Sequence, residues 1–160
     1  MNKEINELRK KFIKYNIDGY VVPKNDDYFT EYSKINRLKI ISNFSGSAGL
    51  AIILKNKNYL FTDGRYTIQS EMESGKYFKI VSYEKIINCN LFKNLRLGLD
   101  PKLFTYQQIK NYFLKNNQIK FLSNNLIDEI KAPKVINSIP FFHSKMKLLE
   151  KIENQKLIKL

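Results

Sequence analysis

Apolar residues along this chain follow two patterns, one typical of helices and one typical of strands. Near the amino terminus, Ile5, Leu8 and Phe12 recur at three- and four-residue spacing among charged residues, which predicts an amphipathic helix over 2–16. Further on, β-branched and aromatic residues form short runs between Gly, Pro, Asn and Lys, and each run predicts a strand. These runs cover 20–22, 50–54, 59–62, 78–83, 95–99 and 119–122.

A second long helix is predicted over 105–116. Thr105 and Gln108 have the spacing of a capping box, and Ile109 and Phe113 fall on one face of the helix. Helical and strand patterns therefore alternate from one end of the chain to the other. This alternation predicts an α/β domain in which helices flank a mixed β-sheet.

The strands 50–54 and 59–62 are close enough in sequence to pair as an antiparallel hairpin. A turn of small residues at 45–49 precedes them, and we expect Gly46 and Gly49 to serve as structural turn residues there. Glycines can also bring backbone amides around a phosphate. However, this turn lacks the Lys and Ser/Thr of a P-loop and leads into a strand, which favours a structural role.

Asp63 follows the second hairpin strand and is placed to cap a helix over 65–74. Gly75 is then expected to end that helix in a left-handed conformation, as a further structural turn. The polar segment 25–39 predicts a loop with one short helix, capped from its Asn-Asp-Asp opening.

The end of the chain differs from the rest. The segment 131–143 contains Pro133 and Pro140 and is expected to be an extended linker after a domain that spans 1–130. The segment 144–160 predicts a loosely amphipathic helix whose apolar side has no following element to pack against. It resembles the opening of a second domain that is missing.

The net charge of +13 raises the question of nucleic-acid binding. Only four of the 28 basic residues are arginines, and the lysines are scattered among many Asn and Ile residues, a bias that an A+T-rich coding sequence produces without selection for binding. No RNA-recognition signature, helix-turn-helix or Arg-rich block accompanies the charge. The sequence therefore favours a solvated lysine-rich surface, with nonspecific nucleic-acid binding as the less favoured alternative.

The chain has no apolar run near the roughly 20 residues that a membrane-spanning helix needs, and its charged start is unlike a signal peptide. The expected location is the cytoplasm, without a membrane partner. A single cysteine, Cys89, and a single histidine, His143, exclude a Cys-based zinc site and leave no nucleophile with a histidine triad. Asp63 and Arg65 are open to two interpretations, a catalytic pair or a helix cap with an ion-pair partner, and the second is favoured.

Three blocks together give a more specific indication. They are DGYVVPKNDDYFTEY at 18–32, ISNFSGSAGLAII at 41–53 and LFTDGRYTIQSEMESG at 60–75, followed by GLDP at 98–101 and NLIDEI at 125–130. In order and spacing they resemble the N-terminal domain of aminopeptidase P, in the creatinase/prolidase N-terminal domain family. One departure is Asn43, where the pattern has glycine, and Asn tolerates a left-handed torsion better than most residues.

The resemblance implies a cytoplasmic metallopeptidase that removes an N-terminal residue preceding proline. It also implies that catalysis belongs to a separate domain, in which two Asp, one His and two Glu hold a pair of metal ions, usually manganese. None of those ligands has a counterpart here, so we expect no catalytic residue, metal site or cofactor in this chain, and no peptidase activity on its own.

By the same resemblance, Asp63, Gly64, Arg65 and Tyr66 form the surface that faces substrate or a neighbouring domain. The leading hypothesis is a truncated or split Xaa-Pro aminopeptidase that retains only its non-catalytic N-terminal domain. The alternative is a regulatory or assembly module that docks on a separately encoded metallopeptidase chain. A homo-oligomer is the other partner considered.

Overall fold

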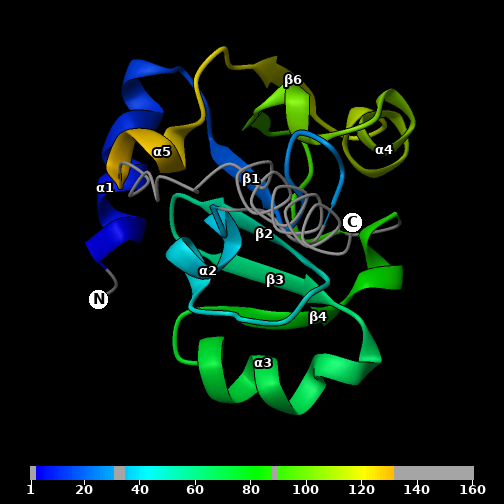
Figure 1. Ribbon diagram of the computed structural model, residues 1–160. Coiled ribbons are helices and arrows are strands. Elements are labelled where there is room, and N and C mark those ends of the chain that lie inside the picture. Colours follow the sequence, from blue (N-terminus) through cyan, green and yellow to red (C-terminus); the bar gives the residue numbers. More distant parts are fainter. Residues whose placement is uncertain (1–2, 31–34, 88–89, 132–160) are drawn as a thin grey trace, which may run out of the picture.

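The computed structural model describes residues 3–30, 35–87 and 90–131, and in this part of the chain helices cover a six-stranded mixed β-sheet (Figure 1). The strands lie in the order β4-β3-β2-β1-β5-β6. β2 pairs antiparallel with β1 and β3, and all other neighbours pair in parallel, so five strands run in one direction. Their bounds are β1 Gly19–Pro23, β2 Gly49–Leu54, β3 Asn58–Thr62, β4 Lys79–Ser82, β5 Arg96–Leu99 and β6 Gln118–Phe121. The predicted fold class is confirmed.

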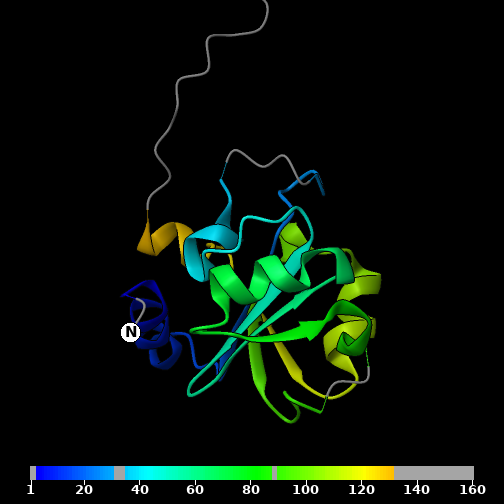
Figure 2. The same cartoon turned by 90° about the horizontal axis from the view of Figure 1, so that it is seen from below.

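Two hydrophobic clusters fill the space above and below the sheet. One lies under the longer helices, and the other under α4 and short turns. The elements on the first face are α1 (Lys3–Lys14), α2 (Arg37–Ser42), α3 (Thr67–Ser74) and α5 (Leu126–Ile130), and those on the second are η2 (Tyr83–Ile86), η3 (Pro101–Leu103), α4 (Tyr106–Ile109) and its π-helical continuation η4 (Lys110–Leu114). Figure 2 shows α3 lying across the sheet, with α2 next to one end of α3.

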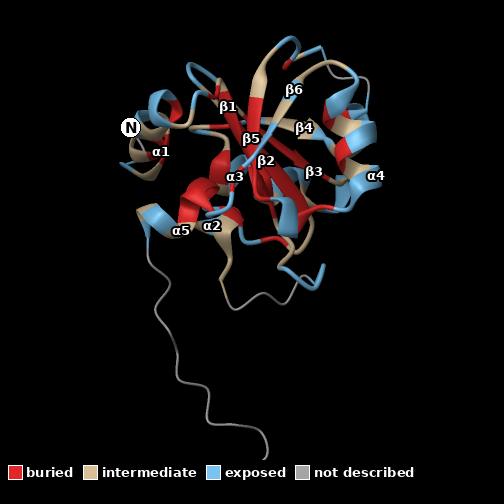
Figure 3. Ribbon diagram, turned by 90° about the horizontal axis from the view of Figure 1, so that it is seen from above, coloured by how far each residue is buried: buried red, intermediate tan, exposed pale blue. Residues whose placement is uncertain are grey.

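The central strands are buried on both faces because helices cover both. Every residue of β1 is buried, and so are the first five residues of β2 (Figure 3). The edge strands β4 and β6 have partly or fully exposed residues only. This explains why the central strands read as continuous apolar runs rather than as alternating ones.

The predicted amphipathic helix is α1. Its apolar positions Ile5, Leu8 and Phe12 are buried, as their spacing predicts. Arg9 lies between them on the helix and donates from Nε to the Leu54 carbonyl oxygen and from Nη2 to Asn58 Oδ1, both at 2.9 Å. These bonds fix α1 across the end of the hairpin formed by β2 and β3.

Side chains cap three of the helices. Thr105 and Gln108 form the predicted capping box at the start of α4. Asn36 caps α2 and Asn125 caps α5 by accepting from the backbone N–H groups of Lys39 and Ile127.

The short helix predicted within 25–39 starts later than its expected cap. It begins at Arg37. The Asp26 carboxylate at the opening of this segment does not cap it, because that carboxylate accepts the hydrogen bonds of a turn instead. Asp26 accepts from the backbone N–H groups of Tyr28 and Thr30 and from the Thr30 hydroxyl. An aspartate that bonds to the backbone two residues on forms a turn rather than a helix start.

Two torsion predictions had different outcomes. Asn43 ends α2 with φ 65° and ψ −5°, so the left-handed torsion expected at this departure from the family pattern is confirmed. The left-handed prediction for Gly75 was wrong, since Gly75 has φ −57° and ψ −24°. A Cβ at Gly75 would lie 2.5 Å from the Glu71 carbonyl oxygen, so close approach of backbone, and not a positive φ, accounts for glycine at the end of α3.

The last described helix, α5, packs onto the body of the domain. The Tyr20 hydroxyl accepts a hydrogen bond from the Leu126 backbone N–H at 3.2 Å, and burial raises the pKa of this phenol. Arg37 of α2 makes two bonds to the Asp128 carboxylate, at 2.9 and 2.8 Å. Because Leu126 and Ile127 are fully buried, α5 completes the hydrophobic core.

Some predictions fall outside the described residues. The terminal helix 144–160 and all but the first residue of the linker 131–143 lie there, as do Cys89 and His143. None of the helices in the described ranges combines the length and apolar character that a bilayer crossing requires.

Asp18 joins the starts of two neighbouring strands. Its carboxylate accepts from Arg96 Nε and Nη2 and from the Arg96 backbone N–H, at 3.0 to 3.1 Å, and from Lys55 Nζ at 2.7 Å. Arg96 also donates to Asn16. Hydrogen bonds from Arg96, followed by those from Lys55, hold the pKa of Asp18 far below its ordinary value.

Replacing this carboxylate should weaken the fold in a pH-dependent way. We expect Asp18→Asn to lower the free energy of unfolding at pH 7 by about 1–2 kcal/mol, a range reduced from that of buried charged bonds because Arg96 and Lys55 are partly solvated. The folded-state pKa is depressed, so this contribution is present above about pH 4 and is lost as pH falls toward the folded-state pKa.

Urea unfolding at pH 7, 5, 3 and 2 measures the effect. The difference between wild type and Asp18→Asn should shrink steadily below about pH 4. Glu84→Gln, which removes an exposed carboxylate, should match wild type throughout. A difference that is constant over the whole pH range would contradict the assignment.

Candidate functional site

The residues predicted to face a partner lie directly after β3. Asp63 caps the 3-10 turn η1 (Gly64–Tyr66) by accepting from the Arg65 backbone N–H at 2.9 Å. The Arg65 side chain turns back onto the same carboxylate, with Nη2 2.8 Å from Oδ2. This pair lowers the pKa of Asp63, and the Arg65 side chain is 73% exposed. The cap and ion-pair interpretation therefore describes the geometry of both residues.

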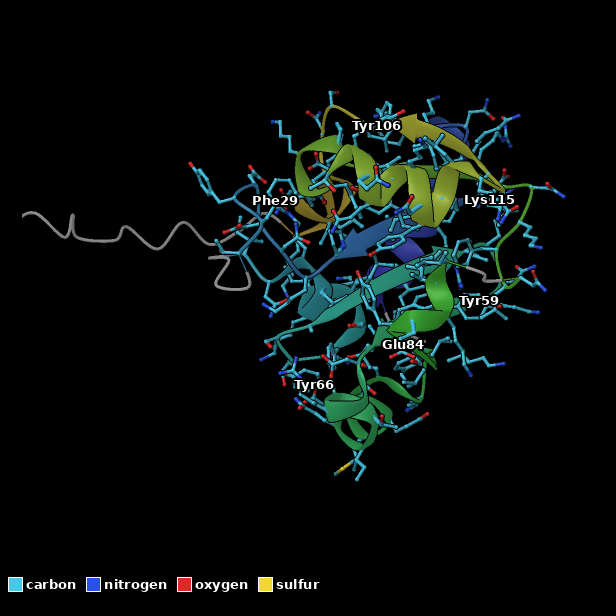
Figure 4. All side chains as sticks on the ribbon, turned by 90° about the vertical axis from the view of Figure 1, so that its right-hand side faces the viewer. Phe29, Tyr59, Tyr66, Glu84, Tyr106 and Lys115 are labelled. Carbon is cyan, nitrogen blue, oxygen red and sulfur yellow. The ribbon has the colours of Figure 1, made fainter. Side chains whose placement is uncertain are left out.

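Tyr66 links this turn to the turn at 45–49. Its ring meets the ring of Phe44 edge to face, with centroids 5.7 Å apart, and its hydroxyl lies 2.8 Å from Ser47 Oγ. The Arg65 guanidinium lies over the Tyr66 ring, 5.4 Å from its centroid. Figure 4 shows Tyr66 at the same end of the sheet as Phe29, which is the end where β1 and β3 finish. Two turns that are separate in sequence thus form one surface.

Glu73 of α3 connects this helix to the turn at 45–49. Its two carboxylate oxygens accept from the Ser45 backbone N–H and from the Ser45 hydroxyl, both at 2.7 Å. Gln69 donates to both Ser45 Oγ and Glu73 Oε1. Burial acts to raise the pKa of Glu73, but the bonds from Ser45 and Gln69 outweigh it and lower the pKa. Sequence reasoning missed Glu73, and the only signal was a Gln and a Glu four positions apart on one helix face.

The glycines of the first turn serve packing. A Cβ on Gly46 would lie 2.2 Å from Cζ of the buried Phe44 ring. Gly49, which was expected within the turn, is the first residue of β2, where a Cβ would meet Leu38 and Phe44 at 3.0 and 3.1 Å. No described glycine has a positive φ. Because the Ser45 amide is already bonded to a carboxylate, the turn is poorly suited to hold a phosphate.

Two apolar side chains are exposed beside this surface. Ile68 is 77% exposed and Met72 is 84% exposed, and they lie four residues apart on the outer side of α3. The inner side of α3 instead carries Ser70 and Ser74, which are buried against the sheet. The surface therefore presents a guanidinium and an apolar pair to its surroundings.

The carboxylates of this site already have hydrogen-bond partners among the described residues. Nowhere in these ranges do three or more His, Cys, Asp or Glu side chains come together as metal ligands. Asp63 is bonded to Arg65, and Glu73 is bonded to Ser45 and Gln69. The arrangement suits contact with another molecule or domain.

Comparison with known proteins gives a consistent result. The model of the creatinase/prolidase N-terminal domain family matches residues 5–130. Aminopeptidase P1 of Lotus japonicus is 33% identical over 138 residues, which cover 77% of this chain and 21% of that protein. The chain spans less than a quarter of the length of the curated relatives that it matches first.

Solved structures share the fold. The X-prolyl aminopeptidase of Caenorhabditis elegans, described as a cytosolic enzyme with a dinuclear active site, aligns with a TM-score of 0.69 at 23% identity, over 79% of this chain and 25% of that one. The N-terminal domain of the cytoplasmic peptidase PepQ of Mycobacterium tuberculosis aligns with a TM-score of 0.61 at 16% identity, over 82% of this chain and all of that one.

The packing role of the first turn can be tested with two glycines. Gly46→Ala should lower the free energy of unfolding by about 1–3 kcal/mol, because the added methyl group meets a ring that is fixed in the core. Gly64→Ala is the matched control, since nothing lies within 4 Å of a Cβ there and its effect should stay within about 1 kcal/mol. Chemical denaturation measures both, and equal effects at the two positions would contradict the packing role.

Proposed function

The chain belongs to the creatinase/prolidase N-terminal domain family, and from this we propose that it is a non-catalytic domain of an Xaa-Pro aminopeptidase-like protein. In this proposal, peptide-bond cleavage depends on a dinuclear metal site that lies outside these residues. The proposal rests mainly on how little of its relatives this chain matches. The family model covers an N-terminal domain, and the relatives are more than four times as long as the part that they share with this chain.

The donor groups of the chain support this assignment. A pair of divalent ions that activates a bridging water needs several converging carboxylates and, by the family resemblance, an imidazole. The full sequence has one histidine, His143, which lies outside the described residues. The described carboxylates do not converge in groups of three. The residues present therefore do not fit a dinuclear metal centre, and we assign no step of catalysis to them.

The role of the domain is then one of contact. Arg65 is exposed and paired with Asp63, and Ile68 and Met72 extend the same surface with exposed apolar groups. Apolar side chains and an arginine in a fixed conformation are typical of surfaces that become buried on association. We infer that this surface faces substrate or the catalytic domain of the same protein. The cytoplasm is the location proposed, as it is for the C. elegans relative.

The same surface supports a second form of the proposal. If catalysis resides in a separately encoded chain, this domain would dock on it through Arg65, Ile68 and Met72 and complete or regulate it. The exposure of the apolar pair favours this form over a chain that acts alone.

The proposal predicts that the purified chain does not hydrolyse Xaa-Pro peptides. With manganese and a peptide that has proline at its second position, turnover should equal the background of a His143→Ala preparation made in the same way. His143→Ala is the matched control because it removes the only imidazole of the chain. Size-exclusion chromatography separates any contaminating peptidase from the 19.0 kDa chain.

Turnover that co-elutes with the chain and is lost in His143→Ala would overturn the proposal. The assay also distinguishes its two forms. The transcript beyond codon 160 is sequenced, and any separate reading frame with the five metal ligands is expressed with the chain. Activity that needs both products, and that falls when Met72→Asp is introduced, supports docking. Ligands in the same frame support a single longer protein.

A further inference from the structure

The topology gathers lysines, with almost no carboxylates, where the amino ends of the strands lie. Five strands run in one direction, so their amino ends lie together with the hairpin at 55–57. We call this row of strand ends the amino edge of the sheet, and the opposite row of strand ends the carboxyl edge. Six exposed lysines lie in the loops at the amino edge or at the first residue of β4, and we call them the lysine rim. They are Lys55, Lys57, Lys76, Lys79, Lys93 and Lys115.

Carboxylates are almost absent from this edge and gather at the opposite one. In the described loops before β1, β4, β5 and β6 and in the hairpin, Asp18 is the only acidic residue, and it is bonded to Arg96 and Lys55. The loops and turns at the carboxyl ends of the strands instead carry Asp26, Asp27, Asp63, Glu84 and Asp100. Figure 4 shows Lys115 and Phe29 at opposite ends of the sheet.

The strand order places the rim lysines in a row. From β4 to β6 the row begins with Lys76 and Lys79, passes Lys57 and Lys55 at the hairpin, and ends with Lys93 and Lys115. Strands lie about 4.8 Å apart, so the row extends over about 24 Å. Lys57, Lys79, Lys93 and Lys115 make no ion pair with any described residue, which leaves their charges uncompensated.

The rim is hollowed where β5 and β6 begin. A depression of about 530 Å³ lies there. Its lining includes Asp18, whose carboxylate is paired with Arg96 and Lys55, together with Asn94, Lys115, Asn116, Asn117 and Gln118. Side-chain amides and cations are the groups that donate to phosphate oxygens. The depression therefore adds neutral donors to a row of positive charges.

We propose that the lysine rim binds the phosphate backbone of a nucleic-acid duplex without reading its sequence. A linear row of cations matches a linear row of phosphates, and lysine binds phosphate as a point charge. The scatter of lysines along the sequence conceals this row, because the loops that carry them are 14 to 22 residues apart and meet only through the sheet.

The chemistry of the rim favours this partner over an acidic protein. Protein interfaces are depleted in lysine and depend on aromatic or arginine anchors near their centre. The exposed Tyr28, Phe29, Tyr106 and Phe121 all follow the carboxyl ends of strands or end β6, so within the described ranges no fully exposed aromatic side chain lies on the rim. Without aromatic residues on which bases can stack, a duplex backbone is a better ligand than a single strand.

Fluorescence anisotropy with a labelled duplex of about 20 base pairs tests the proposal over 50–250 mM salt. The logarithm of the binding constant should fall with the logarithm of salt with a slope of about −3 to −4, as expected for contacts with about four phosphates. The variant Lys57→Glu/Lys93→Glu/Lys115→Glu should bind at least about 30-fold more weakly at 100 mM salt.

The matched control is Lys39→Glu/Lys102→Glu/Lys110→Glu, which changes the net charge equally at exposed lysines outside the rim. It should lose less than about threefold in affinity, if the rim and not the total charge binds the phosphates. Thermal unfolding verifies that both triple variants fold. Equal losses in the two variants, a flat salt dependence, or tighter binding of a single strand or of polyglutamate would each overturn the proposal.

Discussion

The pairing of β1 on both of its sides is the constraint on which the structure depends. β1 is antiparallel to β2 and parallel to β5, so it joins the hairpin half of the sheet to the half that carries α4. Both faces of β1 are buried, and its ends are tied to other elements. Asp18 before it holds Arg96 and Lys55, and the hydroxyl of Tyr20 within it fixes the start of α5. A change in its register would expose one apolar cluster or the other.

The direction of this central strand, which four other strands share, also determines which residues lie at the amino ends of the strands and which lie at the carboxyl ends. The carboxyl edge carries the capped turn with Asp63 and Arg65, next to the exposed apolar pair on α3. The amino edge carries the lysine rim. Since the two surfaces lie at opposite ends of the strands, contact with a catalytic domain at one edge leaves the other accessible. The proposed aminopeptidase-related role and the proposed binding of a phosphate backbone are therefore compatible.

Local chemistry made much of the fold predictable. The strands follow from short β-branched and aromatic runs, the α4 start from its capping box, and the torsion at Asn43 from the known tolerance of Asn for left-handed conformations. The α2 start was misplaced because Asp26 satisfies a turn before the chain reaches the real cap at Asn36. The prediction for Gly75 failed for a different reason. Glycine is needed there because a Cβ would lie too close to the Glu71 carbonyl oxygen, and sequence spacing does not reveal such distances.

The candidate site was less predictable than the fold. Asp63, Arg65 and Tyr66 were found through the family resemblance. The structure shows where they lie, and the molecule or domain that they contact is a proposal. Glu73 could not be found, because its bonds to Ser45 cross 28 positions in sequence. The lysine rim was hidden in the same way, since five strands in one direction are needed to assemble it. Interactions between distant residues are what a single sequence conceals most.

We propose that these residues form a domain without its own metal centre. The most direct measurement is a calorimetric titration of the purified chain with manganese at micromolar concentrations. We expect no saturable heat of binding, because the chain has one histidine and the described carboxylates do not come together in groups of three. Saturable binding of two ions per chain would contradict the proposal.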